Sequence, residues 1–532
     1  MNPGYRIVLT ASRAEMSQYG PEAGDAADGF MAFYCTFPKL FANPFIRKYF
    51  IPINDRDGRA RFAPYSLRKV EAALADHYGP DKIVICHPDN LKEFVGRQTK
   101  VVGITTMDPL GLAYVSITYN SLFPFGGETV NSHEFNKLMA KVSSLKETYP
   151  FKVVVGGEAT WQIDQSGLQA ALGIDTLVVG RSDAETVPTM DKIISGSAPS
   201  VMRFGRASNT KADKVPLIRA PAIYGDTEIT RGCGRGCAFC SPDLLSKYSV
   251  PLEDVMREVE VNIRGGTDTI FTITDDLFLY ESKEMFAPNR RAIVNLYSAI
   301  ANHPGVKWIH LSHASLAPVL IDKKLLPELA PILVGKSSRR LQGKRYATVE
   351  IGIESGSVEI MRKYMKGKAL PLKIDDWPQI VREGIAVFNE NNIYPLGTIV
   401  LGWPGETEKD SSETARLIDA LHDQGAKMFY TPVLFIPIER TPLERSKRAS
   451  LKGLSQTQLD IIERCWEYNV ELWGGEIPKH WIRIVGIGAK AVGIWRRMTG
   501  NEPTTIHNQF GDFLLRTKIP CDPGLCDGKL RS

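Results

Sequence analysis

The segment Thr230-Arg-Gly-Cys-Gly-Arg-Gly-Cys-Ala-Phe-Cys240 decides the fold, because it is a glycine-rich loop that directly follows a predicted β-strand at 227–231. Its cysteines, Cys233, Cys237 and Cys240, have the spacing CxxxCxxC. Thiolates are the ligands of iron–sulfur clusters, and three of them leave one iron of a 4Fe–4S cube open. A structural zinc loop is the alternative, but zinc takes four ligands and no fourth Cys or His lies nearby in the sequence.

Strand and helix patterns alternate on both sides of this loop. After it, short β-branched segments predict strands at 269–273, 307–311, 346–353, 396–401 and 428–436. Before it, similar segments predict strands at 83–87, 101–106, 153–158 and 176–180. Amphipathic stretches separate the strands, and such alternation is typical of parallel sheets covered by helices. Six strand–helix units are too few for a complete eight-fold barrel, so they predict a partial barrel with its active site at the carboxyl ends of the strands.

The predicted fold class is therefore α/β, with four parts along the chain. They are a Rossmann-like doubly wound sheet (1–194), a linker (195–220), a partial (β/α)6 TIM-type barrel (221–440) and a mostly helical C-terminal extension (441–532). The linker is polar and rich in small residues. In the extension, Ser455 and Gln458 predict a helix-starting capping box. Residues 11–57 show no clear period and are expected to be a long loop or a cap over a ligand.

Composition limits the possible partners and location. The chain has 532 residues, 43% of them hydrophobic, and a formal net charge of +5, which does not favour nucleic acid or an anionic membrane as partner. No apolar run approaches the ~18 residues of a membrane span, and the first residues lack a signal-peptide pattern. Eight cysteines are too sparse for a disulfide framework. We therefore expect a cytoplasmic protein without a membrane or nucleic-acid partner.

The cysteine loop and three later segments together resemble the signature of the radical S-adenosylmethionine enzymes. Residues 272–278 (TITDDLF) resemble the acidic motif that meets the amino group of the cosubstrate, 350–356 (EIGIESG) the ribose-side motif, and 402–407 (GWPGET) the loop near the adenine. The resemblance implies a 4Fe–4S cluster on the three cysteines and S-adenosylmethionine beside it. The residues implied on the S-adenosylmethionine side are Phe239, Asp275, Asp276, Glu350, Glu354, Ser355 and Gly402. Ordinary capping at strand ends is the alternative role of the carboxylates.

A Rossmann-like domain ahead of the cluster domain resembles the cobalamin-binding, or class B, radical S-adenosylmethionine methyltransferases. In that family a corrinoid lies between the two domains, at the carboxyl edge of the sheet. The residues implied here are Thr105, Thr106, Met107, Asp108, Gly111, Leu112, Gly156, Gly157, Glu158 and Gly180. The chain has no Asp-x-His-x-x-Gly, so no histidine from that motif would bind cobalt from below, and Met107 or Asp108 is expected near it. Simple turns are the alternative interpretation of these glycines.

The resemblance implies methylation of an unactivated carbon, with two S-adenosylmethionine molecules and an electron donor. The chain as a whole resembles methanogen enzymes that methylate residues of methyl-coenzyme M reductase. The expected substrate is thus a protein or peptide, modified after translation, with a glutamine of that reductase as the preferred candidate. A lipid, tetrapyrrole or natural product remains an open alternative.

Other interpretations also remain open. A cobalamin-free methylthiotransferase would share the central domain, but it normally needs three N-terminal cysteines and only Cys35 and Cys86 precede the linker. A cluster- or corrinoid-binding sensor is another alternative. Cys521 and Cys526 could form a second metal site with Cys465 or His507, or could be free thiols. The side chains that could face the cavity are His310, His313, Phe429, Tyr430 and Phe435.

Overall fold

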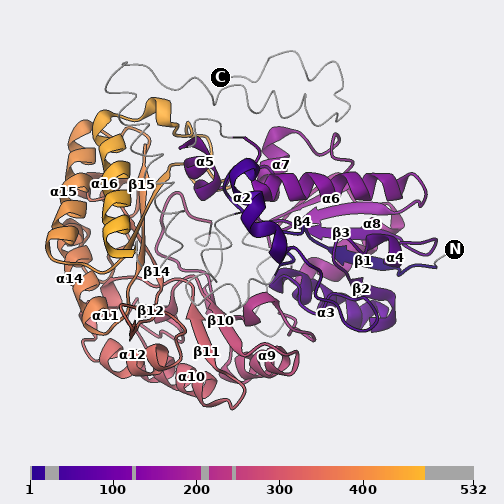
Figure 1. Cartoon of the computed structure of the whole chain (residues 1–532), viewed down its shortest axis with the longest axis horizontal. Helices are drawn as coiled ribbons and strands as arrows, with labels where there is room; N and C mark the ends of the chain where they lie inside the picture. The colour runs from indigo at the N-terminus through magenta and orange to yellow at the C-terminus, as the bar shows by residue number, and fades with distance from the viewer. Residues whose placement is uncertain are drawn as a thin grey trace.

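The structure is a computed structural model that describes residues 3–17, 35–122, 127–181, 183–204, 215–241, 247–284 and 286–473. It is an α/β fold with parallel sheets, as the alternating pattern predicts. Two sheet-containing units lie side by side, and the N-terminal sheet stands beside the open side of the barrel-like unit (Figure 1). The predicted metal residues Cys521, Cys526 and His507 lie outside the described residues.

The N-terminal unit is a six-stranded parallel sheet with the order β2-β1-β3-β4-β5-β6. Its strands are β1 Ile7–Thr10, β2 Ile83–Ile85, β3 Val101–Thr105, β4 Lys152–Gly156, β5 Thr176–Val179 and β6 Val201–Arg203. The sequence pattern does not predict strand β1. Strand β6 lies inside the segment 195–220 that is predicted as a linker, so at these three residues the polar composition conceals an edge strand.

Helices cover both faces of this sheet. On one face, α3 (Tyr65–Tyr78) and α8 (Thr186–Ser195) share a core with β1. On the other face, α4 (Leu91–Phe94), α6 (Val130–Lys146) and α7 (Thr160–Ser166) form a second core. The central strands are thus buried on both sides, which is why they are rich in β-branched residues and lack polar alternation.

The barrel-like unit, residues 226–434, contains two three-stranded parallel sheets, β11-β10-β7 and β14-β15-β16. A parallel bridge between His313 and Glu350 connects them. The strands are β7 Asp226–Glu228, β10 Thr269–Ile273, β11 Trp308–Leu311, β14 Glu350–Glu354, β15 Leu396–Leu401 and β16 Phe429–Leu434. The outer helices are α9 Leu252–Arg264, α10 Arg290–Asn302, α11 Ala317–Ile321, α12 Leu325–Gly335, α13 Val358–Tyr364, α14 Trp377–Glu390 and α15 Glu408–Asp423 (Figure 1).

Short elements complete the described chain. They are α2 Lys39–Ile46, α5 Tyr114–Ser121 and the two-stranded pairs β8 Thr230–Arg231 with β9 Tyr248–Ser249 and β12 Arg340–Leu341 with β13 Lys344–Arg345. The helix predicted in the C-terminal extension is α16, Gln456–Trp473. Its capping box is confirmed, because Gln458 N–H donates to Ser455 Oγ and Ser455 N–H donates to Gln458 Oε1.

The N-terminal unit closes the open side of the barrel-like unit. At one border, the Leu434 N–H of the terminal strand β16 donates to Thr118 Oγ1 of α5, at 2.8 Å. At the other border, α3 packs against α9, where Lys69 Nζ lies 2.5 Å from Glu258 Oε1 and Tyr65 O–H donates to the same carboxylate. The barrel interior therefore faces the sheet of the N-terminal unit.

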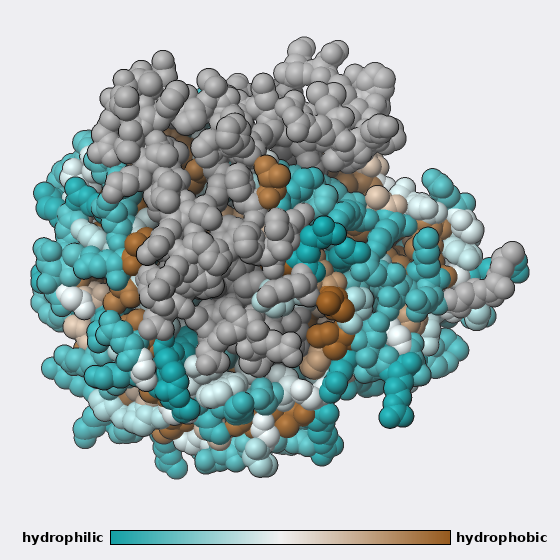
Figure 2. Space-filling model, viewed as in Figure 1, coloured by the Kyte–Doolittle hydropathy of each residue, from teal (hydrophilic) through white to brown (hydrophobic). Residues whose placement is uncertain are grey.

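The surface is mainly hydrophilic on the face shown in Figure 2, where the hydrophobic residues of the described chain form small, separate areas. None of the helices in the described ranges combines the length and the apolar composition that a bilayer crossing requires.

Candidate active site at the cysteine loop

The cysteine loop begins directly after β8 and turns sharply at three glycines. Gly232, Gly234 and Gly236 have φ values of 74°, 76° and 76°, a region that other residues rarely adopt. Cys237 is buried, whereas Cys233 and Cys240 are partly exposed. In the described residues, no three His, Cys, Asp or Glu side chains surround one point that could hold a single metal ion. Three cysteines on one short loop are the donor set that a 4Fe–4S cluster with one open iron uses.

A buried arginine, Arg235, anchors the loop to its surroundings. Its guanidinium lies 3.2 Å from Asp276 Oδ2 and donates to the Leu370 carbonyl at 2.8 Å. The segment after α13 passes so close to the loop that a Cβ on Gly367 would lie 1.9 Å from the Arg235 carbonyl oxygen. Sequence reasoning did not single out Arg235 or Gly367, yet together they fix the position of the cysteines.

The two predicted acidic residues, Asp275 and Asp276, have different surroundings. Asp276 is buried and accepts hydrogen bonds from Phe278 N–H, Ser315 O–H and Arg235, so its carboxylate shapes the loop. Asp275 accepts a hydrogen bond from Gly232 N–H at 2.6 Å and lines a large cavity between the two units. Burial raises the pKa of Asp275, although Arg181 opposes that shift. Of the pair, Asp275 is therefore the one that can meet a ligand.

The ribose-side segment contains a strained residue, Glu354, with φ of 66° beside a β-bulge. Such a backbone is uncommon for a residue other than glycine and is often found at functional sites. Lys368 Nζ lies 2.7 Å from Glu354 Oε1. Burial alone would lower the pKa of Lys368, but the charges of Glu354, Cys237 and Cys240 raise it, so a fixed cation stands beside the thiolates. By contrast, Glu350 lines the cavity.

The segment 402–407 forms a turn against the aromatic residue of the cysteine loop. Phe239 packs edge-on against Trp403, with ring centroids 5.1 Å apart. The N–H groups of Gly402 and Trp403 both donate to Glu406, which holds the turn. Ser355 contacts Thr414 in a buried hydrogen bond, so Ser355 and Gly402 shape loops. All four sequence segments thus meet around the three cysteines.

A cavity of about 1090 Å³ lies between the sheet edge and the barrel interior. It exceeds the roughly 300–1,000 Å³ of typical ligand pockets. The predicted residues that line it are Thr105, Met107, Asp108, Gly156, Gly157, Glu158, Gly180, Asp275 and Glu350. The predicted residues Thr106, Gly111 and Leu112 are not among its lining residues.

The two residues expected near a bound cobalt, Met107 and Asp108, differ in availability. The Asp108 carboxylate accepts hydrogen bonds from Ala113 N–H, Gln162 Nε2 and Ser116 O–H, so it is held within the fold. Met107 is 65% exposed and lines the cavity. The thioether of Met107 is therefore better placed than Asp108 to meet a ligand.

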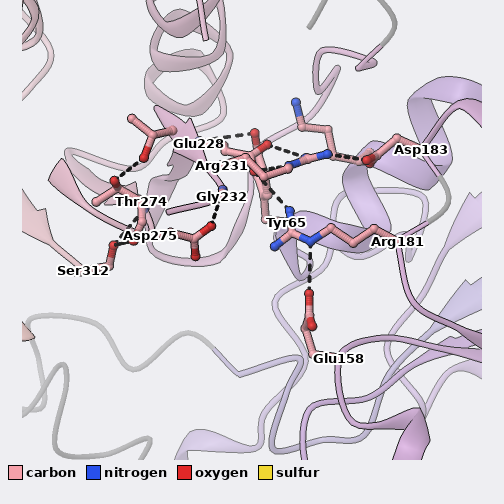
Figure 3. Close-up of polar contacts among 12 residues, drawn as sticks. Tyr65, Glu158, Arg181, Asp183, Glu228, Arg231, Gly232, Thr274, Asp275 and Ser312 are labelled. Carbon is pink, nitrogen blue, oxygen red and sulfur yellow. Dashed lines mark hydrogen bonds and ion pairs between the residues drawn. The ribbon is translucent and has the colours of Figure 1, made fainter. Parts of the chain in front are cut away.

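An ion-pair network joins the two units beside the cysteine loop (Figure 3). Arg181, which follows β5, lies 3.2 Å from Glu158 and 3.2 Å from Glu228 of β7. Arg231 of β8 contacts Glu228 at 2.7 Å and also pairs with Asp183. Burial would raise the pKa of Glu228, but Arg231 and then Arg181 hold it below its ordinary value. The network connects the sheet edge to the residue just before the loop.

The sequence analysis did not identify Glu15, whose carboxylate contacts the loop that follows β3. Glu15 Oε1 accepts hydrogen bonds from Met107 N–H at 2.7 Å and Thr106 O–H at 3.3 Å. Its other oxygen, Oε2, is buried with no hydrogen-bond partner among the described residues, and the side chain lines the cavity. Burial raises the pKa of Glu15 to about 7.

Replacing Glu15 with Gln is expected to change the pH dependence of stability. Because the pKa is raised, the folded protein binds this proton more tightly than the unfolded chain. The stabilising contribution of Glu15 to the free energy of unfolding is therefore complete below pH about 4.5 and is lost as the pH rises through about 7. The unfolding free energy of E15Q minus that of the wild type should rise by on the order of 2 kcal/mol between pH 5 and 8 in urea titrations. The exposed Glu147→Gln is the control, and equal slopes for both variants would contradict the shift.

Comparisons with known proteins agree with this geometry. Residues 227–418 match the model of the Radical SAM superfamily. Among curated proteins, the ribosomal protein uS12 methylthiotransferase of Cytophaga hutchinsonii is 24% identical over 238 residues, which cover 44% of this chain and 49% of that protein. The tRNA-2-methylthio-N(6)-dimethylallyladenosine synthase of Nitrosomonas eutropha is 24% identical and is covered over 69% of its length. The chain thus spans only about half of the first of these relatives.

Among solved structures, the radical S-adenosylmethionine methyltransferase TsrM of Kitasatospora setae, with cobalamin and a 4Fe–4S cluster bound, superimposes with a TM-score of 0.53. The match has 15% sequence identity and covers 83% of this chain and 77% of TsrM, which shows a shared fold. Because the superfamily match spans the cysteine loop, β7 to β15 and most of α15, residues 227–418 form a radical S-adenosylmethionine domain.

Proposed function

We propose that the protein is a cobalamin-dependent radical S-adenosylmethionine C-methyltransferase. The observation that carries this proposal is a large cavity that is lined both by the carboxyl edge of the N-terminal sheet and by Arg231 and Ser241, which flank the cysteine loop. A corrinoid is a flat, bulky ligand, and glycines along that edge leave room for it. The shared fold with TsrM supports the same arrangement.

Each group has a set of residues that would hold it. Cys233, Cys237 and Cys240 would bind the cluster, and Asp275 and Glu350 would meet S-adenosylmethionine. The corrinoid would lie against Met107, Gly156, Gly157, Glu158 and Gly180. When bound, these groups supply hydrogen-atom abstraction and methyl delivery. The balanced reaction converts R–H, two S-adenosylmethionine and two electrons into R–CH3, S-adenosylhomocysteine, methionine and 5′-deoxyadenosine. The electrons require an external donor.

The residues of this chain prepare the site for that reaction. Arg235 and Asp276 hold the cysteine loop in place, and Lys368 provides a positive charge beside the thiolates. The Arg181 network fixes the sheet edge relative to the loop, so two bound groups would keep a constant separation. Such positioning is the main contribution a protein makes to cofactor chemistry.

A methylthiotransferase is the second candidate, because the curated relatives carry that name. Against it, the N-terminal unit has only Cys35 and Cys86 before residue 195, and both are buried. In addition, burial raises the pKa of the Cys86 thiol, which disfavours the thiolate that cluster binding needs. Mass spectrometry of the product separates the candidates, since methylation adds CH2 and methylthiolation adds CH2S.

The identity of the molecule whose carbon accepts the methyl group is a separate part of the proposal. The resemblance implies a protein or peptide residue, with a glutamine of methyl-coenzyme M reductase as the preferred candidate. The lining of the barrel interior favours a different acceptor.

Replacing Gly156 with Leu is expected to lower cobalamin content at least about tenfold without changing iron content. The backbone of Gly156 is unstrained, and the atom nearest to a Cβ at this position would be Val178 Cβ, 3.9 Å away, so a leucine would extend into the cavity. Iron, sulfide and cobalt are measured in protein purified without oxygen after growth with cobalamin. Gly335→Leu, at the exposed end of α12, is the matched control.

The same inventory tests the proposal itself. About four irons and one cobalt per chain are expected for the wild type. Four irons without cobalt, even after reconstitution, would remove the methyl carrier and contradict the proposal.

A further inference from the structure

Three neighbouring strands present a row of side chains deep in the cavity. Phe271 of β10 pairs in register with Asp226 of β7 on one side and with His310 of β11 on the other. All three residues line the cavity. They lie two residues before Glu228, Ile273 and Ser312, in the direction away from the cysteine loop. None of the four segments that resemble the family signature contains a residue of this row.

His310 is an unpartnered base in this row. Its Nε2 is buried with no hydrogen-bond partner among the described residues. Burial, and then the charge of Arg339, lowers the pKa of His310 to about 3, so its ring is neutral at physiological pH. A neutral imidazole can donate one hydrogen bond to a ligand that enters the cavity.

Arg339 lies near His310 and is the cation of this region. It lines the cavity, and its Nε is buried without a hydrogen-bond partner in the described part of the chain. Within that part, no carboxylate lies within ion-pair distance of its guanidinium. The Arg339 side chain is partly buried, and the fork of a guanidinium matches a carboxylate in two parallel hydrogen bonds.

Aromatic side chains form the wall next to Arg339. Tyr346, whose N–H donates to the Arg339 carbonyl, stacks on Tyr394 with centroids 4.9 Å apart. The ring centroids of Trp473 and Tyr346 lie 5.6 Å apart. Phe429 and Phe271 also line the cavity. Aromatic walls of this kind favour planar, apolar ligand groups.

We propose that the methyl acceptor is a small aromatic carboxylate, with its carboxylate on Arg339 and His310 and its ring against the aromatic wall. This inference rests on the proposed function. Tyr346 and Tyr394 precede β14 and β15, and Phe429 begins β16, so the ring and the carboxylate would both lie toward the start of the strands.

Several acidic side chains line the same cavity, among them Asp226 of this row and Glu350. Burial raises the pKa of Asp226 to about 8, so it is mostly protonated at neutral pH and would not repel an anion. With strands about 4.8 Å apart, it lies roughly 10 Å from His310, across Phe271. Glu350 stands beside His313, at 3.5 Å. A neutral amide such as glutamine would leave the Arg339 guanidinium without an anion, whereas a carboxylate would pair with it.

Binding of two matched probes tests the inference. Indole-3-acetate and its neutral analogue indole-3-acetamide are titrated calorimetrically into protein purified without oxygen. The acid is expected to bind at least about 30-fold more tightly than the amide. Arg339→Met should remove most of that preference while changing the affinity for the amide less than about threefold, and Arg339→Lys should restore part of it. Arg340→Met, at the exposed neighbouring residue, should leave both affinities unchanged.

Equal affinities for acid and amide, or an equal loss of both in Arg339→Met, would overturn the inference. So would methylation of a glutamine peptide by a protein that does not bind the acid. Thermal unfolding and iron content of Arg339→Met establish that the variant is folded. Because binding is measured without turnover, missing cobalt would contradict the proposed function alone, whereas normal iron and cobalt without acid preference would contradict this inference alone.

Discussion

Replacing Cys237 with Ser is expected to lower 5′-deoxyadenosine formation to below about 0.1% of the wild-type rate, because one iron of the cluster loses its thiolate. Cys237 is the buried member of the three cysteines and precedes Ala238, whose N–H donates to the Tyr364 carbonyl. The product is quantified by chromatography after reduction with dithionite in the presence of S-adenosylmethionine.

Cys86→Ala is the matched control for this experiment. Cys86 is also a buried cysteine, but it lies at the end of β2 in the N-terminal sheet. Product formation should stay near the wild-type rate if the only cluster is at the loop, and a loss in Cys86→Ala would instead favour a second N-terminal cluster. Full activity and full iron content in Cys237→Ser would contradict the assignment of the cluster.

Replacing Glu258 with Ala is expected to lower the free energy of unfolding by about 3–5 kcal/mol, because it leaves a buried lysine without its partner. The side chains of Lys69 and Glu258 are 9% and 3% exposed. Glu258 also accepts hydrogen bonds from Tyr65 O–H and Ile218 N–H, so several groups of the two units lose their acceptor together. Urea unfolding followed by fluorescence measures the change.

Two controls separate the buried pair from a general effect of the helix. Glu253→Ala removes an exposed pair with Arg257 on the same helix and should cost less than about 1 kcal/mol. The double variant Lys69→Met, Glu258→Leu removes both charges and should recover much of the loss. A single variant as stable as Glu253→Ala would show that the pair does not hold the two units together.

The sequence predicted the strands best where short β-branched runs mark them. Residues 269–273 and 396–401 coincide with β10 and β15, because β-branched runs followed by polar residues are typical of buried parallel strands. Strand β6 could not be recognised, since it has three partly exposed residues at the edge of the sheet. Strand β1 is only four residues long and precedes a segment without any period, yet it lies inside the sheet.

The sequence identified the segments of the site better than the individual side chains. It could not tell that Asp275 faces the cavity while Asp276 bonds to Arg235, or that Met107 is exposed while Asp108 is held by hydrogen bonds, because these contacts come from residues far away in the sequence. Glu15 could not be found at all, because its hydrogen-bond partner Met107 lies 92 residues away in the sequence.

The way in which the N-terminal unit closes the barrel also has a consequence for solubility. Strands β7 and β16 are the two terminal strands of the barrel-like unit, and unpaired edge strands promote association between chains. Here Glu228 N–H of β7 donates to Tyr65 O–H, and Leu434 N–H of β16 donates to Thr118 Oγ1. Side chains of the N-terminal unit thus occupy both edges. Because that unit leaves the ribosome first, it can cover each edge as the strand emerges, before two nascent barrels aggregate.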